Sequence, residues 1–279
     1  MAQHLAGVRV ALTGPRKSKE MSILVEKMGG IPLVRPAQGT VFLDDRSIRD
    51  GLVSWISDPP DWAVLTTGMG LDALFEMAED MEVAGQLLDV LSESSIAARG
   101  YKTVNALKKR KLTPLVRDDD GSTDGLIREF APHDLAGKKV ILQLHGETAP
   151  KLVAWLEEQG AIVRQVLPYR HVPPEEAELE QLLNEILKFE VDAVAFTSGP
   201  QVRFLTQYAA SQDKLEPMLA AFRQGVIPAS VGKVTANSMR EEGIEALVIP
   251  EEEKMGALIV ELGRYFAAGR AAKSSGLQS

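Results

Sequence analysis

Two stretches decide the fold: residues 61–68, which read DWAVLTTG, and residues 192–199, which read DAVAFTSG. Each contains an uninterrupted apolar run, which is typical of a strand covered on both faces in a parallel sheet. Each then ends in two hydroxyl residues and a glycine. The chain therefore contains the same strand and the same polar turn twice.

The similarity extends outward from these stretches as an internal repeat. Residues 5–7, which read LAG, recur as residues 135–137, and Gly30 matches Gly160. The matching blocks keep their order at an offset of 130 to 132 residues. Because several ordered blocks at nearly one offset are hard to obtain by chance, we divide the 279 residues into two related halves of ordinary domain size.

Helical spacing separates the apolar runs. Apolar residues recur on one helix face in residues 21–28, before Gly29 and Gly30, and again in residues 179–187. Strands that alternate with such helices are typical of doubly wound domains. The sequence therefore predicts the α/β class, with two pseudo-duplicated, parallel-sheet, flavodoxin-like domains.

Composition excludes several kinds of protein. The formal net charge is −8, without a dense basic stripe, which argues against binding to nucleic-acid phosphates. The absence of cysteine excludes disulfides and thiolate-bound metals. No apolar run approaches a membrane span, and no signal peptide is evident, so we expect a cytoplasmic protein that does not bind membranes.

Ligands of open parallel sheets lie beyond the carboxyl ends of the strands, where helix N-termini present free N–H groups. The repeated polar triplets occupy this edge in both halves, as do two G-x-x-T turns. An anion-binding role competes with a purely structural one, because serine and threonine also cap helices. The candidate contacts are Thr66, Thr67, Gly68, Thr103, Thr197, Ser198, Gly199, Gly232 and Thr235.

The halves differ at Tyr169, opposite which the first half has Gly39. A hydroxyl in this connecting segment could reach into a cleft between the two edges, although a packed strand tyrosine is the alternative. The four histidines lack the spacing of a metal site, so we expect no bound metal.

Taken together, these residues resemble the uroporphyrinogen-III synthase family over residues 7–265. The resemblance is carried by T-x-P at residues 13–15, the strand-ending triplet at 197–199, the G-x-x-T turn at 232–235 and Tyr169. The family's usual arginine is replaced by Gly14, with Arg16 two places later. Residues 98–102 and 143–147 are similar to a subgroup of the family.

The resemblance implies two domains joined by a two-stranded linker. Domain 1 would combine residues 1–35 with 173–270, and domain 2 would span 41–166. The linker strands would be residues 36–40 and 167–172. We expect residues 271–279 to form a disordered tail.

The resemblance also implies a lyase of porphyrin and haem biosynthesis that closes the linear tetrapyrrole hydroxymethylbilane to uroporphyrinogen III, with inversion of ring D, in the interdomain cleft. Tyr169 matches the family tyrosine proposed to donate a proton to the leaving hydroxyl. Further substrate contacts would be Thr13, Arg16, Arg99, Lys102, His145 and Gly146.

Two functions stay open. The first is this cofactor-free synthase, expected to act as a monomer. The second is a module of the same fold that senses a tetrapyrrole or another polyanion without turnover and has a regulatory role, which Gly14 and the subgroup-like segments favour.

Overall fold

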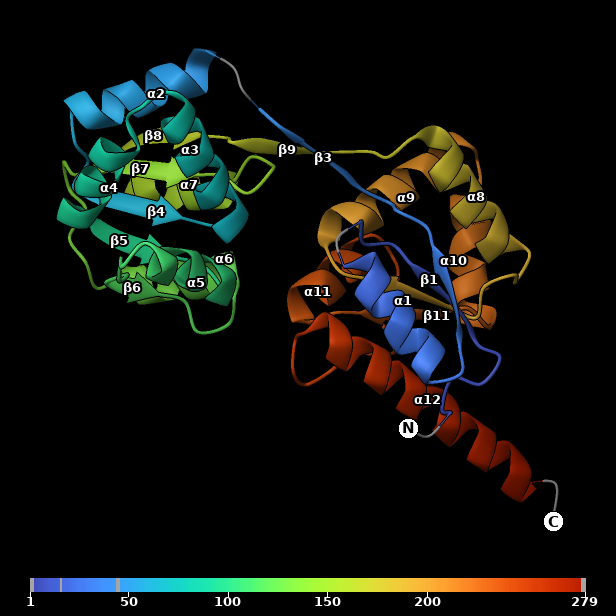
Figure 1. Cartoon of the computed structure of the whole chain (residues 1–279). Coiled ribbons are helices and arrows are strands. Elements are labelled where there is room, and N and C mark those ends of the chain that lie inside the picture. The colour runs from blue at the N-terminus through green and yellow to red at the C-terminus, as the bar shows by residue number, and fades with distance from the viewer. Residues whose placement is uncertain (1–2, 16, 44–45, 277–279) are drawn as a thin grey trace. The chain divides into compact units, whose positions relative to one another are not determined.

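The computed structural model describes residues 3–15, 17–43 and 46–276. The chain forms two compact units (Figure 1). Unit 1 comprises Met1–Gly39 and Val172–Ser279, and unit 2 comprises Thr40–His171. Unit 1 is therefore built from both ends of the chain, whereas unit 2 is continuous.

Unit 1 contains a four-stranded parallel sheet in the order β11-β10-β1-β2. Its strands are β1 (Arg9–Leu12), β2 (Ile31–Val34), β10 (Ala193–Phe196) and β11 (Ile227–Ser230). Its helices are α1 (Ser18–Lys27), α8 (Glu176–Leu187), α9 (Gly199–Ser211), α10 (Leu215–Gln224), α11 (Lys233–Glu241) and α12 (Met255–Gly276). The helices predicted in residues 21–28 and 179–187 are thus present as α1 and α8.

Unit 2 contains a five-stranded parallel sheet in the order β6-β5-β4-β7-β8. Its strands are β4 (Trp62–Leu65), β5 (Ser95–Ala98), β6 (Val116–Arg117), β7 (Lys139–Gln143) and β8 (Ile162–Val166). Its helices are α2 (Arg46–Ser57), α3 (Gly68–Asp80), α4 (Ala84–Glu93), α5 (Tyr101–Lys109), α6 (Thr123–Phe130) and α7 (Pro150–Glu158).

The central strands are apolar at every position because both faces of each sheet are covered. In β4, Ala63 and Leu65 pack in one core with α2, α3 and α4, while Trp62 and Val64 pack in a second core with α6 and α7. The strand β10 divides its residues between two cores in the same way. This arrangement confirms the predicted α/β class with doubly wound parallel sheets.

The direction in which strands are added reverses once in each sheet. In unit 2 the chain proceeds from β4 outward to β5 and β6, and β7 then lies on the other side of β4. In unit 1 the reversal falls between β1 and β10. Ligands of such sheets bind outside the carboxyl ends of the strands at this switch point. The expected ligand sites are therefore the ends of β4 and β7 in unit 2, and the ends of β1 and β10 in unit 1.

Two elements differ from their expected bounds. The linker strands are β3 (Gly39–Phe42) and β9 (Tyr169–Val172), which pair with each other, and not residues 36–40 and 167–172. Helix α12 continues to Gly276, so residues 271–276 are helical and not disordered as predicted, and residues 277–279 lie outside the described part. Apolar residues spaced for the core of unit 1, such as Leu258 and Leu262, start this helix.

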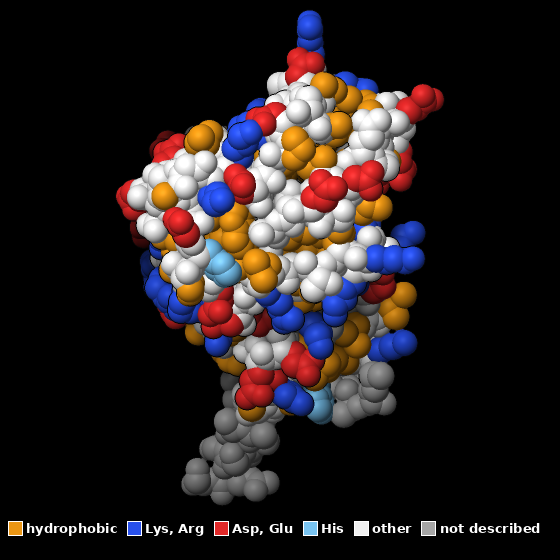
Figure 2. Space-filling model, turned by 90° about the vertical axis from the view of Figure 1, so that its left-hand side faces the viewer, with side chains coloured by type: hydrophobic (Ala, Val, Ile, Leu, Met, Phe, Trp, Pro, Cys, Tyr) orange, Lys and Arg blue, Asp and Glu red, His pale blue; other side chains and the backbone are white. Residues whose placement is uncertain are grey.

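Surface charge is mixed on the face drawn in Figure 2, where acidic and basic side chains alternate over short distances. This face has no field of a single sign that could attract a polyanion from afar. Among the described residues, no helix combines the length and the apolar character of a membrane span.

A bidentate ion pair between Arg9 and Asp192 joins β1 to the start of β10. This pair makes the stability of the fold depend on pH in the acidic range. Asp192 accepts hydrogen bonds from the Arg9 backbone amide at 2.7 Å and from Nε and Nη2 at 3.0 and 2.9 Å. Burial raises the pKa of Asp192, but the hydrogen bonds from Arg9 outweigh it, so this pKa lies below its ordinary value of 3.8. The pair therefore stabilises the fold above the unfolded-state pKa and loses this effect as pH falls.

We expect Asp192→Asn to lower the free energy of unfolding by about 1 kcal/mol at neutral pH, because Asp192 is partly exposed. The difference from the wild type should shrink as pH falls below 3.8. Urea titrations of both proteins at a series of pH values measure it. A difference of the same size at every pH would contradict the ion-pair explanation.

Candidate functional site

The turn after β4 is held by one buried amide from the neighbouring strand. Gln143, the last residue of β7, is fully buried. Its Oε1 accepts hydrogen bonds from the backbone amides of Thr66 and Thr67, both at 3.2 Å, and its backbone carbonyl accepts one from Thr66 Oγ1 at 2.6 Å. The switch point of unit 2 is therefore rigidly built around Gln143.

The two glycines of the turn each make room for a close neighbour. A Cβ on Gly68 would lie 2.5 Å from the carbonyl oxygen of Lys102 in α5. A Cβ on Gly70 would lie 2.0 Å from Gln143 Nε2. Because neither neighbour is the end of an exposed side chain, both glycines of the T-T-G-M-G sequence are required by packing. Thr67 also caps α3 by accepting from the Gly70 amide at 3.1 Å.

Tyr169 lies against this turn. Its hydroxyl is 3.1 Å from Thr67 Oγ1, and its ring contacts those of Phe42 and His171 with centroids 6.2 and 5.3 Å apart. The sequence left open whether this hydroxyl reaches outward or belongs to a packed strand tyrosine, and the side chain is only 1% exposed, as in the second alternative. This burial arises because β9 begins at Tyr169, so that its side chain turns toward the end of β4.

Gly146 allows the tyrosine to take this place. It has a φ of 86°, and a Cβ there would lie 2.6 Å from His171 Cδ2 and 2.7 Å from Tyr169 Cε2. The Gly146 carbonyl also accepts a hydrogen bond from the His171 amide at 3.1 Å. Gly146 therefore shapes the site, while its neighbour His145 follows the buried end of β7 and is partly exposed.

Arg99 brings a positive charge to the same edge, directly after β5. Its Nη1 donates to Thr123 Oγ1 at 2.9 Å, at the start of α6. Burial lowers the pKa of the Arg99 guanidinium, and the charges of Tyr169 and Asp118 act in the opposite direction. Arg99 therefore lies near enough to Tyr169 for the two groups to interact electrostatically.

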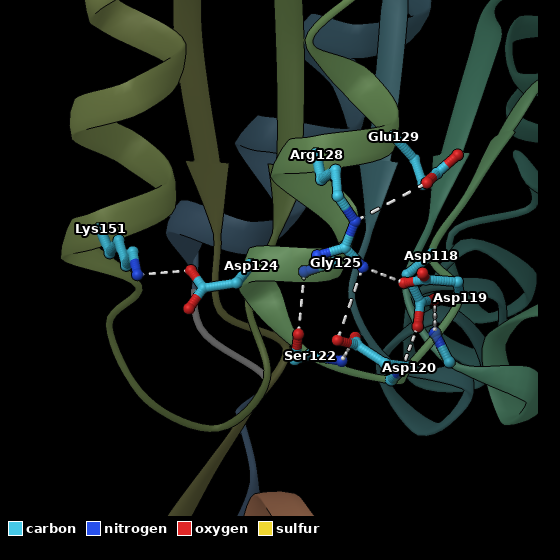
Figure 3. A network of polar contacts seen from close by, with 11 residues as sticks. Asp118, Asp119, Asp120, Ser122, Asp124, Gly125, Arg128, Glu129 and Lys151 are labelled. Atoms are coloured by element: carbon cyan, nitrogen blue, oxygen red, sulfur yellow. Dashed lines mark hydrogen bonds and ion pairs between the residues drawn. The ribbon is translucent and has the colours of Figure 1, made fainter.

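A network of acidic residues closes the loop between β6 and α6 (Figure 3). The Asp118 carboxylate is 5% exposed and accepts hydrogen bonds from the amides of Gly100 and Gly121. Asp120 accepts from the Ser122 amide at 2.8 Å, and hydrogen bonds from Ser122 lower the pKa of Asp120. The amide of Gly100, the N-cap residue of α5, thus donates to the carboxylate of Asp118.

Three of the candidate hydroxyls are buried inside their units. Thr66 donates to the backbone of Gln143, and Thr103 donates to the Arg99 carbonyl at 2.6 Å. The single proton of the Thr13 hydroxyl is shared between two acceptors, the Ala195 carbonyl at 2.9 Å and Gln201 Oε1 at 2.8 Å. These hydroxyls are hydrogen bonded within their own units, and their contact with a substrate stays a prediction. Lys102, in contrast, is exposed on the first turn of α5.

The switch point of unit 1 uses a buried amide as well, but from the helix. Gln201 Oε1 accepts from the Thr197 amide at 2.8 Å, and Gln201 Nε2 donates to Thr197 Oγ1 at 3.0 Å. Ser198 donates to Gln38 at 2.5 Å. A Cβ on Gly199 would lie 2.6 Å from Ser238 Oγ, so this glycine permits close packing of α9 and α11.

In unit 1 as well, a carboxylate of the protein contacts the G-x-x-T turn, which spans residues 232–235. The amide of Lys233 donates to Glu253 Oε1 at 3.2 Å, and a Cβ on Gly232 would lie 2.5 Å from Glu253 Oε2. Thr235 is 5% exposed. Asp118 and Glu253 thus each provide a carboxylate to a G-x-x-T turn, one in each unit.

One of the predicted site residues, Arg16, lies outside the described part of the chain. In the part of the chain that the structure describes, no group of three or more histidine and acidic residues is arranged to hold a metal. The sequence analysis missed Gln143 and Gln201 as site residues. A polar residue at the buried end of the apolar strand β7 was the signal for the first of them.

Comparisons with known proteins identify a family for this chain. The family model described as "Uroporphyrinogen-III synthase HemD" matches residues 19–260. The "Uncharacterized protein YjjA" of Bacillus subtilis (strain 168) is 48% identical over 266 residues, covering 95% of this chain and 98% of that protein.

Solved structures lead to the same family. A mutant uroporphyrinogen III synthase from the extremely thermophilic bacterium Thermus thermophilus is 31% identical, with a TM-score of 0.79 over 92% of this chain and 98% of that one. The wild-type enzyme in another crystal form has the same identity and a TM-score of 0.60, over 95% and 100% of the two chains. A pair of doubly wound sheets, with polar turns at their switch points and a match across most of the chain, places this protein in the uroporphyrinogen-III synthase family.

Proposed function

We propose that this chain converts hydroxymethylbilane into uroporphyrinogen III and water, as a lyase that needs no cofactor. The observation that carries the proposal is the contact of the Tyr169 hydroxyl with Thr67 at the switch point of unit 2, beside Arg99 at the end of the neighbouring strand β5. The match to the Thermus thermophilus synthase over most of both chains supports the same reaction. We further propose that the enzyme acts in the cytoplasm as a monomer.

The chemistry begins with loss of the substrate's terminal hydroxyl. Tyr169 donates its proton to this hydroxyl, the C–O bond breaks, and water leaves. The resulting azafulvene is attacked by the substituted carbon of ring D, and the spiro intermediate then fragments and recloses with ring D inverted. The proton that the substrate releases at the end returns to the phenolate, whose charge Arg99 stabilises meanwhile.

Positioning of the substrate carries the selectivity, because a phenol is a weak acid and the open chain is flexible. We propose that the acetate and propionate groups bind at the exposed cations and the half-buried hydroxyls of the two edges. These groups include Lys102 in unit 2, and Thr197 and Ser198 in unit 1. The interdomain cleft expected from the sequence stays a prediction.

The test is the isomer of the product. Purified protein is supplied with hydroxymethylbilane, and the products are oxidised and separated by chromatography. We expect the type III isomer at a rate proportional to protein concentration. Formation of the type I isomer alone, which arises spontaneously, would refute the proposal.

One observation favours the alternative, a sensing module that binds a tetrapyrrole or another polyanion without turnover. Tyr169 is buried and hydrogen bonded, as a purely structural tyrosine would be. For catalysis the side chains that cover it have to yield, and Phe42, which is 53% exposed, is the neighbour best placed to move. Tight binding of the substrate without any type III product would support the sensor.

A further inference from the structure

We propose that Gln143 is a positioning residue that fixes the direction of the Thr67–Tyr169 hydrogen bond, so that Thr67 donates and the phenol oxygen accepts. The proposal rests on the proposed function for its consequence in catalysis. Its structural part follows from the hydrogen-bond partners alone.

The orientation of the Gln143 amide is determined by its surroundings. Two backbone amides, of Thr66 and Thr67, point at one end of this side chain. Since N–H groups only donate, that end has to be the oxygen. The nitrogen is therefore at the other end, where it donates to the Leu144 carbonyl and to Thr67 Oγ1, the latter at 3.3 Å.

These contacts leave the Thr67 hydroxyl as the donor in its bond with Tyr169. Its oxygen accepts from the Gly70 amide at 3.1 Å and from Gln143 Nε2, which uses both lone pairs. Its own proton is directed to the remaining neighbour, the Tyr169 oxygen at 3.1 Å. The phenol proton of Tyr169 is consequently not used in this bond.

A comparison of the two halves of the internal repeat supports a positioning role for the Gln143 amide. At the offset of 131 residues, Gly70 of unit 2 corresponds to Gln201 of unit 1. Where unit 1 has the amide on its helix, unit 2 has a glycine whose missing side chain leaves the space that Gln143 fills from the strand. Both halves thus keep an amide at the switch point, but only the arrangement in unit 2 connects through its threonine to a tyrosine.

The test reads the direction of the bond without relying on activity. Tyrosine labelled with carbon-13 at Cζ gives a resonance for each of the four tyrosines, and Tyr169→Phe identifies the one from Tyr169. A phenol that donates gains phenolate character, which moves Cζ downfield, whereas a phenol that accepts moves it upfield. In Gln143→Glu, a carboxylate takes the Thr67 proton, so Tyr169 has to donate to Thr67, and we expect a downfield shift.

Two further variants keep the test decisive. Thr67→Val removes the donor and should also move the resonance downfield, even if Gln143→Glu fails to fold. Gln201→Met, which removes the equally buried amide of unit 1, should leave the resonance in place. An upfield shift in Thr67→Val, or no shift in folded Gln143→Glu, would overturn the proposal.

Kinetics separate this inference from the proposed function. We expect Gln143→Glu to lower kcat for type III product about tenfold, with KM within about twofold of the wild type. If the wild type makes no type III product, the function fails while the shifts still decide the direction of the bond. If the shifts go the wrong way in an active enzyme, the role of Gln143 fails and the function stands.

Discussion

Replacing Tyr169 by phenylalanine is expected to lower kcat/KM for the conversion of hydroxymethylbilane to uroporphyrinogen III about 100-fold, which is the usual contribution of a general acid. The ring contacts with Phe42 and His171 stay in place, so the fold should persist. As enzymatic closure slows, spontaneous closure supplies a larger share of type I product. The initial rate of each isomer, followed by chromatography of the oxidised products, measures both effects.

The matched control is Tyr265→Phe, which removes the hydroxyl of a 40% exposed tyrosine on α12. This variant should keep the wild-type rate and isomer ratio. A Tyr169→Phe protein that forms type III product at the wild-type rate would show that the phenol is structural. The side chains that position the substrate would then carry the reaction.

Replacing Gly70 by alanine is expected to destabilise unit 2 by about 3 kcal/mol, because the new Cβ would lie 2.0 Å from a fully buried amide. Gln143 has to leave its place, and the amides of Thr66 and Thr67 then lose their acceptor. Thermal and urea unfolding of the variant and the wild type measure the difference. The same displacement should reduce formation of type III product in the variant that remains folded.

Gly51→Ala is the matched control for this substitution. Gly51 lies within α2, and a Cβ there meets no atom within 4 Å. Because alanine is the better helix former, this variant should gain about 0.5 to 1 kcal/mol. If Gly70→Ala were as stable as the wild type, the buried amide would not be held as tightly as its contacts indicate.

Local patterns explain how much of the fold was predictable. The apolar runs of β4 and β10 had to be covered on both faces, and the helical spacing between the runs supplied the covering elements. The polar triplets predicted the ligand-binding edge because they directly follow the carboxyl ends of both strands in the sequence. These features depend on neighbours within a few residues, so a linear pattern contains them.

The residues that organise the site depend instead on long-range pairing. Gln143 meets Thr66 only because β7 pairs with β4 across the sheet, 77 residues apart in the chain. Asp118 and Gly100 meet because β6 pairs with β5. No periodicity reports such contacts, which is why neither the carboxylate at the Gly100 turn nor the strand-end glutamine was predicted from the sequence.

The sequence by itself determined a duplicated α/β chain with a polar edge in each half, since strand burial and helix periodicity follow from the order of apolar and polar residues. Only the tertiary structure decided that Tyr169 is covered and that Thr67 and Gln143 set its hydrogen bonding. The physical reason is that a buried donor has to find an acceptor in three dimensions, and the partner it finds is chosen by sheet pairing and by the space that glycines such as Gly70 and Gly146 leave.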